Sequence, residues 1–159
     1  MTRVRPSGKA DAAPILRIAR SEPLFTKEDR EVVEELLQEF LADPGGDYFF
    51  LTALDDGKVA GFACYGPTPL TRGTYDLYWI CVARSKRRKG YGRALLRSVV
   101  GRIRREGGRL ITLDTSGRPS FAATRAFYER EGFKASARIA DFYRRHDDLV
   151  IYTYPIPRA

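Results

Sequence analysis

The chain has 159 residues, of which 43% are hydrophobic and 30% charged, a composition typical of a globular domain with a buried core. No apolar run approaches the ~20 residues of a membrane-spanning helix, and the basic first residues lack the apolar stretch of a secretory signal. Two cysteines and one histidine exclude a thiol-rich zinc site, argue against a disulfide framework and predict a reduced, cytoplasmic protein.

The first half of the chain alternates between helical and strand patterns. We expect a short strand at 2–6, a short helix at 14–19, and a longer helix that Thr26 caps and Pro44 ends. Asp55-Asp56-Gly57 lies between two apolar runs, which predicts a β-hairpin. The strands expected in this half are 48–54, 58–65 and 74–82.

The second half continues as a helix, a strand, a second helix and two strands. The first helix follows a basic loop and ends at Gly107-Gly108. The remaining elements are expected at 110–113 (strand), 120–131 (helix), 134–140 (strand) and 149–154 (strand). No repeat or linker divides the sequence, so we expect one domain over residues 1–159.

This order of elements predicts an α/β fold with a mixed, mostly antiparallel sheet of six to seven strands and about four helices. The strand–helix–strand unit in the middle should form a parallel, right-handed crossover. In the strand at 74–82, alternation places Leu77, Trp79 and Cys81 on one face and Tyr78 and Ile80 on the other, so one of the two large aromatic side chains belongs in the core.

The formal net charge of +8 is concentrated in one segment. Residues 84–109 contain eleven basic side chains and one acid, Glu106, so this segment carries +10 and the rest of the chain is slightly acidic. Most of the basic residues are arginines, which bind phosphate in a bidentate manner. Such a patch suits a small polyphosphate ligand at least as well as a nucleic-acid duplex, and a solvated basic helix face explains the same charges.

A glycine-rich turn within this segment separates a strand from an amphipathic helix. Gly90 and Gly92 allow the backbone to approach a ligand closely, and the free N–H groups at the helix start bind phosphate oxygens. The dinucleotide-binding fingerprint does not fit, because Leu95 occupies its third glycine position. A P-loop does not fit either, because Pro67 follows Gly66 where a lysine is needed. A tight turn before a helix explains the two glycines equally well.

Two longer motifs resemble the GNAT family of N-acetyltransferases. Arg87-x-x-Gly90-x-Gly92, after the strand that ends at Val82, resembles the acyl-CoA-binding motif of that family, and Phe127-Tyr128-Glu129-x-x-Gly132-Phe133 resembles one of its helix ends. The resemblance covers nearly the whole chain and is weakest before Tyr48. The chain is most similar to the ribosomal-protein alanine acetyltransferase branch. Its residues 141–151 resemble the C-terminal segment of that branch.

The resemblance implies an N-acetyltransferase that moves the acetyl group of acetyl-CoA to a primary amine by direct attack in a ternary complex, without a metal. It also implies that the central parallel strands are splayed, so that main-chain groups of Ile80 and Val82 pair with the pantetheine. The cofactor-binding residues it implies are Ile80, Cys81, Val82, Arg87, Arg88, Lys89, Gly90, Tyr91, Gly92, Arg93, Thr124 and Phe127.

Two catalytic residues follow from the same resemblance. Tyr128 matches the tyrosine that faces the leaving sulfur, and proton transfer from a phenol of pKa about 10 to a thiolate of about 8.5 is uphill by ~2 kcal/mol. Asp114 matches the position of a glutamate base, and a structural role in capping or pairing explains it as well. Asp76 and His146 are the second and third candidates for the base.

The acceptor amine carries no recognised code in the sequence. We expect the residues that face it to come from the first two helices and from the loop between the last two strands, where an acidic rim would attract a cation. The residues placed in this loop are Tyr143, His146, Asp147 and Asp148. The chain departs from its relatives at Phe121, where asparagine is common, and in a loop at 115–120 that is about two residues longer.

Two other function classes stay open at this point, a non-catalytic acyl-CoA-binding regulator and a basic nucleic-acid-binding protein. The presence of both Tyr128 and Asp114 argues against the regulator. The arginines have no aromatic residues among them apart from Tyr91, which argues against nucleic-acid binding. The expected partners are therefore acetyl-CoA, an amine and, as in many relatives, a second copy of the chain, without a membrane.

Overall fold

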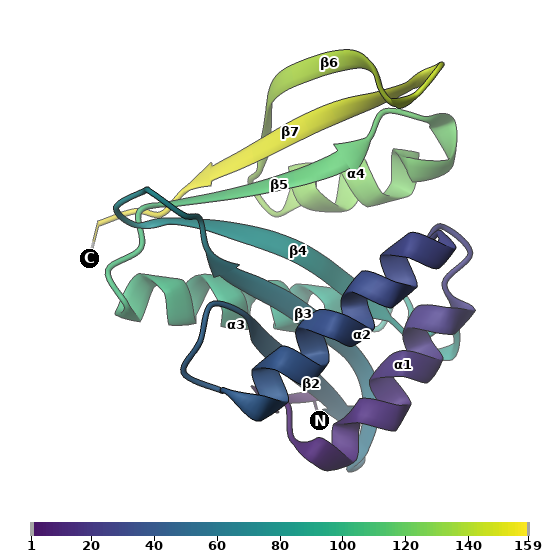
Figure 1. The fold of residues 1–159 in the computed structure, drawn as a ribbon, viewed down its shortest axis with the longest axis vertical. Coiled ribbons are helices and arrows are strands. Elements are labelled where there is room, and N and C mark those ends of the chain that lie inside the picture. The colour runs from purple at the N-terminus through teal and green to yellow at the C-terminus, as the bar shows by residue number, and fades with distance from the viewer. Residues whose placement is uncertain (1, 159) are drawn as a thin grey trace.

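Over residues 2–158, which the structure describes, the computed structural model contains seven strands and four α-helices (Figure 1). Residues 1 and 159 of the predicted domain lie outside this range. The strands are β1 (Thr2–Pro6), β2 (Phe49–Asp55), β3 (Lys58–Pro67), β4 (Thr74–Val82), β5 (Leu110–Ser116), β6 (Lys134–Arg144) and β7 (Asp147–Pro155). The helices are α1 (Ala12–Ser21), α2 (Lys27–Ala42), α3 (Tyr91–Arg105) and α4 (Ala122–Arg130). No helix in residues 2–158 has the length and apolar character needed to cross a membrane.

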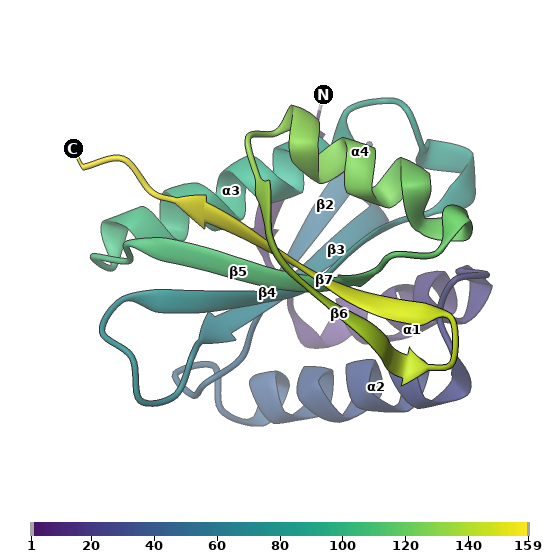
Figure 2. The ribbon, with the colours of Figure 1, turned by 90° about the horizontal axis from the view of Figure 1, so that it is seen from above.

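The seven strands form one mixed sheet in the order β1-β2-β3-β4-β5-β7-β6. Within residues 2–158, every neighbouring pair is antiparallel except β4 and β5, which are parallel and lie at the centre. Helices α3 and α4 cover one face of the sheet and α1 and α2 the other (Figure 2). The predicted α/β class, the mostly antiparallel sheet and the central parallel pair are confirmed.

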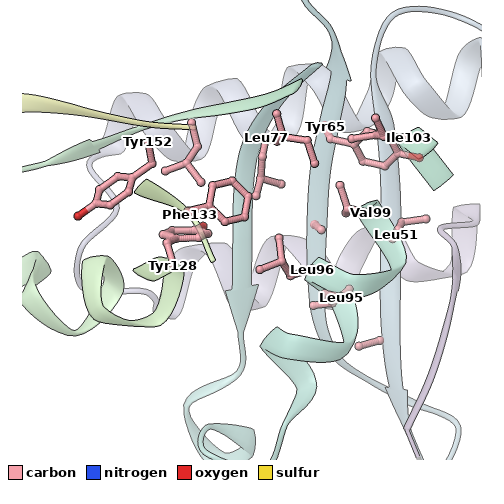
Figure 3. Packing of buried hydrophobic residues seen from close by; sticks show 14 of the residues in the cluster. Leu51, Tyr65, Leu77, Leu95, Leu96, Val99, Ile103, Tyr128, Phe133 and Tyr152 are labelled. Carbon is pink, nitrogen blue, oxygen red and sulfur yellow. The ribbon is translucent and has the colours of Figure 1, made fainter. Parts of the chain in front are cut away.

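Helical spacing places the apolar side of α3 against the sheet. Leu95, Val99 and Ile103 recur at intervals of four residues and are fully buried. They pack in one cluster with Leu51 of β2 and Leu77 of β4 (Figure 3). This cluster extends to α4, so α3 and α4 share a single core layer.

The other face of the sheet holds a second cluster under α1 and α2. Val33 and Leu37 of α2 pack there with Phe50 of β2. The start of α2 is fixed by a reciprocal capping box, because the Thr26 hydroxyl oxygen accepts from the Asp29 N–H at 3.1 Å and the Asp29 carboxylate accepts from the Thr26 N–H at 2.8 Å. The predicted cap at Thr26 is confirmed, and it holds the α1–α2 loop in place.

A β-bulge breaks the side-chain alternation of β4. Leu77 and Trp79 pair with successive residues of β3, so Tyr78 between them has no partner. As a result, Leu77 and Ile80 pack on the α3 side, whereas Tyr78, Trp79 and Cys81 pack on the α1–α2 side. The prediction that Leu77 shares a face with Trp79, and that Tyr78 and Trp79 oppose each other, is therefore wrong.

The last two strands are longer than the sequence pattern predicts. β6 extends to Arg144 and β7 begins at Asp147, so the turn between them contains only Arg145 and His146. Tyr143, Asp147 and Asp148, which were expected in a loop, lie in the strands. The sequence of β6 lacks the apolar alternation of a half-buried strand, because β6 lies at the edge of the sheet and all of its residues are exposed.

Candidate active site

β4 and β5 pair only where they begin. The parallel pairing joins Thr74–Asp76 to Leu110–Thr112, and beyond these residues the strands diverge while β5 stays paired with β7 (Figure 1). From Leu77 to Val82, β4 therefore has one edge bonded to β3 and one edge open. The predicted splay of the central strand pair is confirmed.

A cleft of about 290 Å³ opens at the point of divergence. Its walls come from the α1–α2 loop and the start of α2, the open edges of β4 and β5, helix α4 and the β6–β7 hairpin. The lining residues are Glu22, Leu24, Phe25, Thr26, Asp29, Leu77, Tyr78, Trp79, Ile80, Cys81, Leu113, Asp114, Thr115, Ser116, Arg118, Phe121, Thr124, Tyr128, Tyr143, Arg144 and Asp147. Within residues 2–158, no group of three or more His, Cys, Asp or Glu side chains is placed to hold a metal ion.

Alternation along β4 decides which main-chain groups face the open edge. The Ala83 N–H donates to the Ala60 carbonyl of β3 at 2.8 Å, so Cys81, two residues earlier, also directs its main-chain groups toward β3. Ile80 and Val82 consequently direct their N–H and C=O groups toward the open edge. These are the two residues whose main chain the sequence predicts to pair with pantetheine.

The glycine-rich turn follows the open end of β4 and begins helix α3. Gly90 is the N-cap residue and has φ of +89°, a left-handed conformation that favours glycine. The Ala94 N–H bonds to the Gly90 carbonyl at 3.0 Å, but the N–H groups of Tyr91, Gly92 and Arg93 have no acceptor within the described chain. Three free donors at the positive end of a 15-residue helix make a ready site for an anion.

Ion pairs engage part of the basic side chains of this turn. The pairs are Lys86 with Asp55 at 2.5 Å, Arg87 with Glu22, and Arg93 with Glu131 at 3.3 Å. Arg88 and Lys89 are exposed and have no acidic partner in residues 2–158. The turn therefore offers its main-chain donors and these two free cations to a phosphate.

Three other predicted cofactor residues have different surroundings. The Tyr91 side chain is buried in the core beneath α3, so only its main chain is available at the turn. Phe127 packs beside Gly92, where a Cβ atom would lie 3.5 Å from the ring, and this contact holds α4 against the turn. Thr124 lines the cleft.

Tyr128 reaches the cleft from α4 and is nearly buried. Its ring packs edge-on against Phe133 with a centroid distance of 5.6 Å (Figure 3). Its hydroxyl has no hydrogen-bond partner in residues 2–158, whereas the hydroxyl of neighbouring Tyr152 donates to Glu129 at 2.8 Å. Burial, and then the nearby Cys81, raises the pKa of Tyr128, so the hydroxyl keeps its proton at neutral pH and can donate a hydrogen bond into the cleft.

Asp114 lies within β5, and its carboxylate lines the cleft without a hydrogen bond or ion pair to any described residue. Its side chain reaches water, yet the surrounding protein removes part of its hydration. Burial first and the negative charge of Asp76 second raise the pKa of Asp114. Asp76 itself accepts from the Thr112 hydroxyl at 2.8 Å, and neither it nor the exposed His146 lines the cleft. Among the three predicted bases, the structure places only Asp114 in the cleft.

Tyr143 reaches the cleft from a bulge near the end of β6. The Asp148 carboxylate accepts from the Asp141 N–H at 3.0 Å and from Arg138 at 2.8 Å, and these bonds replace strand pairing over residues 140–143. Burial, followed by the carboxylate of Asp114, raises the pKa of Tyr143 to about 12. The tyrosine therefore offers the cleft a neutral hydroxyl.

The α1–α2 loop contributes a wall that the sequence predicts only in outline. Glu22, Leu24 and Phe25 line the cleft, and Glu22 is nearly buried. A lone acid before a proline gives little signal. Its partner Arg87 lies 65 residues further along the chain, so no local pattern reveals the ion pair.

Comparisons with known proteins agree with this geometry. A profile of the acetyltransferase (GNAT) family matches residues 13–133. The [ribosomal protein bS18]-alanine N-acetyltransferase of Escherichia coli is 31% identical over 120 residues, which cover 74% of this chain and 78% of that protein. A crystal structure of the ribosomal-protein-S18-alanine N-acetyltransferase from Escherichia coli superposes with a TM-score of 0.79 at 23% identity, covering 100% of this chain and 96% of that one.

Two further structures have the same fold. A GNAT-family protein from Desulfovibrio desulfuricans superposes with a TM-score of 0.95 at 45% identity, covering 99% of this chain and 100% of that one. An N-acetyltransferase from Thermoplasma acidophilum, solved in complex with coenzyme A, superposes with a TM-score of 0.73 at 16% identity, covering 97% of this chain and 99% of that one.

Proposed function

The chain is an N-acetyltransferase of the GNAT family, and from this premise we propose that it transfers the acetyl group of acetyl-CoA to a primary amine by direct attack in a ternary complex. The observation that carries the proposal is a single cleft in which the hydroxyl of Tyr128 and the carboxylate of Asp114 meet the open edge of β4. Acetyl-CoA supplies the activated acyl group as a thioester. The coenzyme A held by the Thermoplasma protein of the same fold supports this donor.

The chain's own groups fit such a donor along the open part of β4 and the turn that follows it. Ile80 directs its N–H and C=O groups, and Val82 its N–H group, to the open edge, where an amide-containing arm can continue the sheet. The Val82 carbonyl accepts from Arg87 at 3.3 Å. The free N–H groups of Tyr91, Gly92 and Arg93 then receive the pyrophosphate oxygens. These main-chain N–H and C=O groups therefore provide most of the contacts that bind acetyl-CoA.

Val82 also has an electrostatic role in this proposal. Its N–H points to the open edge of β4, where it can donate to the carbonyl oxygen of the thioester. A fixed donor at this place stabilises the negative charge that develops as the amine attacks. The carbon–nitrogen bond forms as the carbon–sulfur bond breaks, and the sulfur leaves as a thiolate.

Tyr128 supplies a proton to that thiolate. In water a phenol of pKa about 10 gives its proton to a thiolate of pKa about 8.5 at a cost of ~2 kcal/mol. Burial raises the pKa of Tyr128 further, but the same loss of hydration destabilises a thiolate in the cleft, so the two effects offset each other. Because the Tyr128 hydroxyl has no acceptor among the described residues, it can donate a hydrogen bond to the sulfur as the negative charge develops there.

Asp114 receives the proton that the amine loses, directly or through one water molecule. An alkylammonium has a pKa near 10.4 and an α-ammonium a pKa near 7.7–8.0, so an α-amine loses its proton more readily. The raised pKa of Asp114 makes its carboxylate a stronger base than an ordinary aspartate. The Escherichia coli relative acts on an alanine of ribosomal protein bS18, so peptides that begin with alanine belong among the first acceptors to assay.

Calorimetric titration with acetyl-CoA at low and moderate salt, followed by an assay of amine-dependent CoA release, tests the proposal. We expect one-to-one binding that survives ~0.2 M salt, because main-chain donors rather than a diffuse charge field hold the ligand. Binding without CoA release from any amine would instead indicate a non-catalytic acyl-CoA sensor. Binding that salt abolishes would indicate that the basic segment serves a nucleic acid.

A further inference from the structure

The far end of the cleft, formed by the β6–β7 hairpin and the segment after β5, carries two arginines on one buried carboxylate. Asp147 has a side chain that is 5% exposed, and it accepts from the Ser116 hydroxyl at 2.5 Å. Arg144 donates to the same carboxylate at 3.1 Å, and Arg118 lies 3.8 Å from it. Both arginines line the cleft and are about half exposed.

This corner has a surplus of positive charge. Arg144 alone neutralises Asp147 through a direct hydrogen bond. Arg118 approaches at ion-pair distance only, so most of its N–H donors remain free. The neighbouring pair of Arg138 with Asp148 is balanced one to one.

The opposite charge lies elsewhere in the same cleft. The Asp29 carboxylate is engaged by the main chain and hydroxyl of Thr26, and Glu22 is paired with Arg87. Asp114 is the lining carboxylate that has no partner among residues 2–158. The cleft is therefore bipolar, with an unpaired carboxylate at Asp114 and an unbalanced guanidinium beside Asp147.

The two charged sites are separated by several bond lengths. Asp114 and Ser116 project from the same face of β5, two residues or roughly 6.6 Å apart, and the Ser116 hydroxyl holds Asp147. One molecule can meet both sites only if several bonds separate its amine from its anionic group. A plain α-amino acid is too short for this span.

The corner is also held rigidly. The Arg125 side chain donates to the Ser116 and Arg118 carbonyls at 2.7 and 2.8 Å, and the Arg118 N–H donates to the Ser116 hydroxyl oxygen at 3.1 Å. These bonds fix the path of residues 116–118, which belong to the loop that the sequence predicts to be longer than in relatives. Because this backbone is already fixed, a ligand that binds Arg118 does not have to order the segment that carries it.

We propose that the acceptor is a primary amine that carries a carboxylate several bonds from its nitrogen, with the amine at Asp114 and the carboxylate at Arg118 and Arg144. This inference rests on the proposed acetyl transfer and names its substrate class. A peptide with an acidic second residue and an ω-amino acid both have this chemistry.

The test compares matched acceptors that differ only in the distal charge. The peptide pair is Ala-Glu-amide and Ala-Gln-amide, and the small-molecule pair is 4-aminobutyrate and 4-aminobutanamide. We expect kcat/KM at least roughly tenfold higher for the anionic member of one pair, the discrimination of one charge-assisted hydrogen bond. Whichever pair shows this preference identifies the peptide or the small molecule as the acceptor type.

Variants of Arg118 then test whether the arginines beside Asp147 cause the preference for the anionic acceptor. Arg118→Gln should bring the ratio within each pair close to one, and Arg118→Lys should keep part of it, because the charge remains. Arg118→Gln leaves the Arg144–Asp147 bond intact, so folding is preserved. Arg130→Gln is the control, because Arg130 is an exposed arginine of α4 that does not line the cleft.

The outcomes separate the two proposals. Acetylation of both members of each pair at equal rates, or a preference that Arg118→Gln does not change, would overturn the bipolar acceptor and leave the transferase intact. A protein that acetylates none of the four amines but releases CoA with other primary amines would overturn the bipolar acceptor alone. Binding of acetyl-CoA without CoA release from any amine would overturn the proposed transfer, and the acceptor class with it.

Discussion

The carboxylate of Glu22 and the guanidinium of Arg87 form an ion pair that joins the α1–α2 loop to the glycine-rich turn before α3. Glu22 is nearly buried, with a side chain that is 10% exposed, and its second oxygen accepts from the Leu24 N–H at 3.1 Å. Arg87 also donates to the Val82 carbonyl at 3.3 Å. The cleft wall formed by the α1–α2 loop is thus held against the glycine-rich turn, although the two segments are distant in sequence.

We predict that Arg87→Met lowers the free energy of unfolding by about 1–3 kcal/mol, because it leaves a buried carboxylate without its partner. Glu22→Gln should cost less, because it removes the charge and keeps the shape. Urea denaturation at neutral pH measures both. The control is Lys27→Met, which breaks an exposed ion pair with Glu31 and should change stability by less than about 1 kcal/mol. If Arg87→Met and Lys27→Met lowered the free energy of unfolding equally, the burial of Glu22 would not be what makes its ion pair important.

For Tyr128→Phe, we predict nearly normal affinity for acetyl-CoA and a turnover reduced by roughly 10²–10⁴-fold, the contribution of one positioned proton donor. The variant should fold normally, because the hydroxyl it removes has no protein partner in the described chain. Tyr152→Phe is the matched control, since it removes a hydroxyl that donates to Glu129 and should lower stability by about 1 kcal/mol while sparing turnover. Full activity of Tyr128→Phe would exclude the tyrosine as the proton donor.

The pH dependence of kcat/KM tests Asp114 as the base. Because burial and Asp76 raise the pKa of Asp114, the acidic limb of the profile should lie above the ordinary aspartate value of 3.8. Asp76→Asn removes the repelling charge and should move this limb to lower pH without removing it. The shift is measured from initial rates across the acidic range. An acidic limb that stays in place would show that another group titrates.

Stability should change in the opposite sense to activity at Asp114. A carboxyl whose pKa is raised in the folded protein stabilises the fold below its unfolded pKa, and this stabilisation is lost as the pH rises through the folded pKa. Asp114→Asn should therefore unfold at higher urea concentration than the wild type at neutral pH. The difference should vanish below the ordinary aspartate pKa, while the variant loses acetyl transfer at neutral pH.

Substitution of Gly90 by aspartate should abolish acetyl-CoA binding in a calorimetric titration. The new side chain places a negative charge at the phosphate-binding donors and must adopt φ of +89°. Gly57→Asp is the control, because Gly57 has a similar φ of +77° and equally free space but lies in the β2–β3 hairpin. Gly92→Ala should fold normally, since its Cβ meets Phe127 at an ordinary 3.5 Å. Unchanged acetyl-CoA affinity of Gly90→Asp would contradict the phosphate-binding turn.

The fold was predictable where local pattern and tertiary packing agree. The apolar spacing of Leu95, Val99 and Ile103 follows the buried side of α3, and Thr26 begins α2 as its capping chemistry indicates. The glycine-rich turn was predictable because Gly90 adopts a conformation that few other residues accept. In each case, the residues that decide the structure are neighbours in sequence.

The features that the sequence did not reveal depend on distant partners. The bulge at Tyr78 follows from the register between β3 and β4, which alternation within one strand does not specify. The ion pair of Glu22 with Arg87, and the two arginines on Asp147, join segments that only the folded sheet brings together. The sequence also did not reveal that the Tyr91 side chain is buried, because the direction of a side chain at the start of a helix depends on how the helix packs against the sheet.

The divergence of β4 and β5 has a consequence for the lifetime of the protein. Main-chain groups along both open edges give up sheet bonds that most folds would make at their centre. A ligand that pairs with them contributes to the folded state alone, and at 100 times its dissociation constant it adds about 2.7 kcal/mol to the unfolding free energy. With acetyl-CoA as this ligand, as proposed above, the protein should resist heat and proteolysis better when the acyl donor is abundant than when it is scarce.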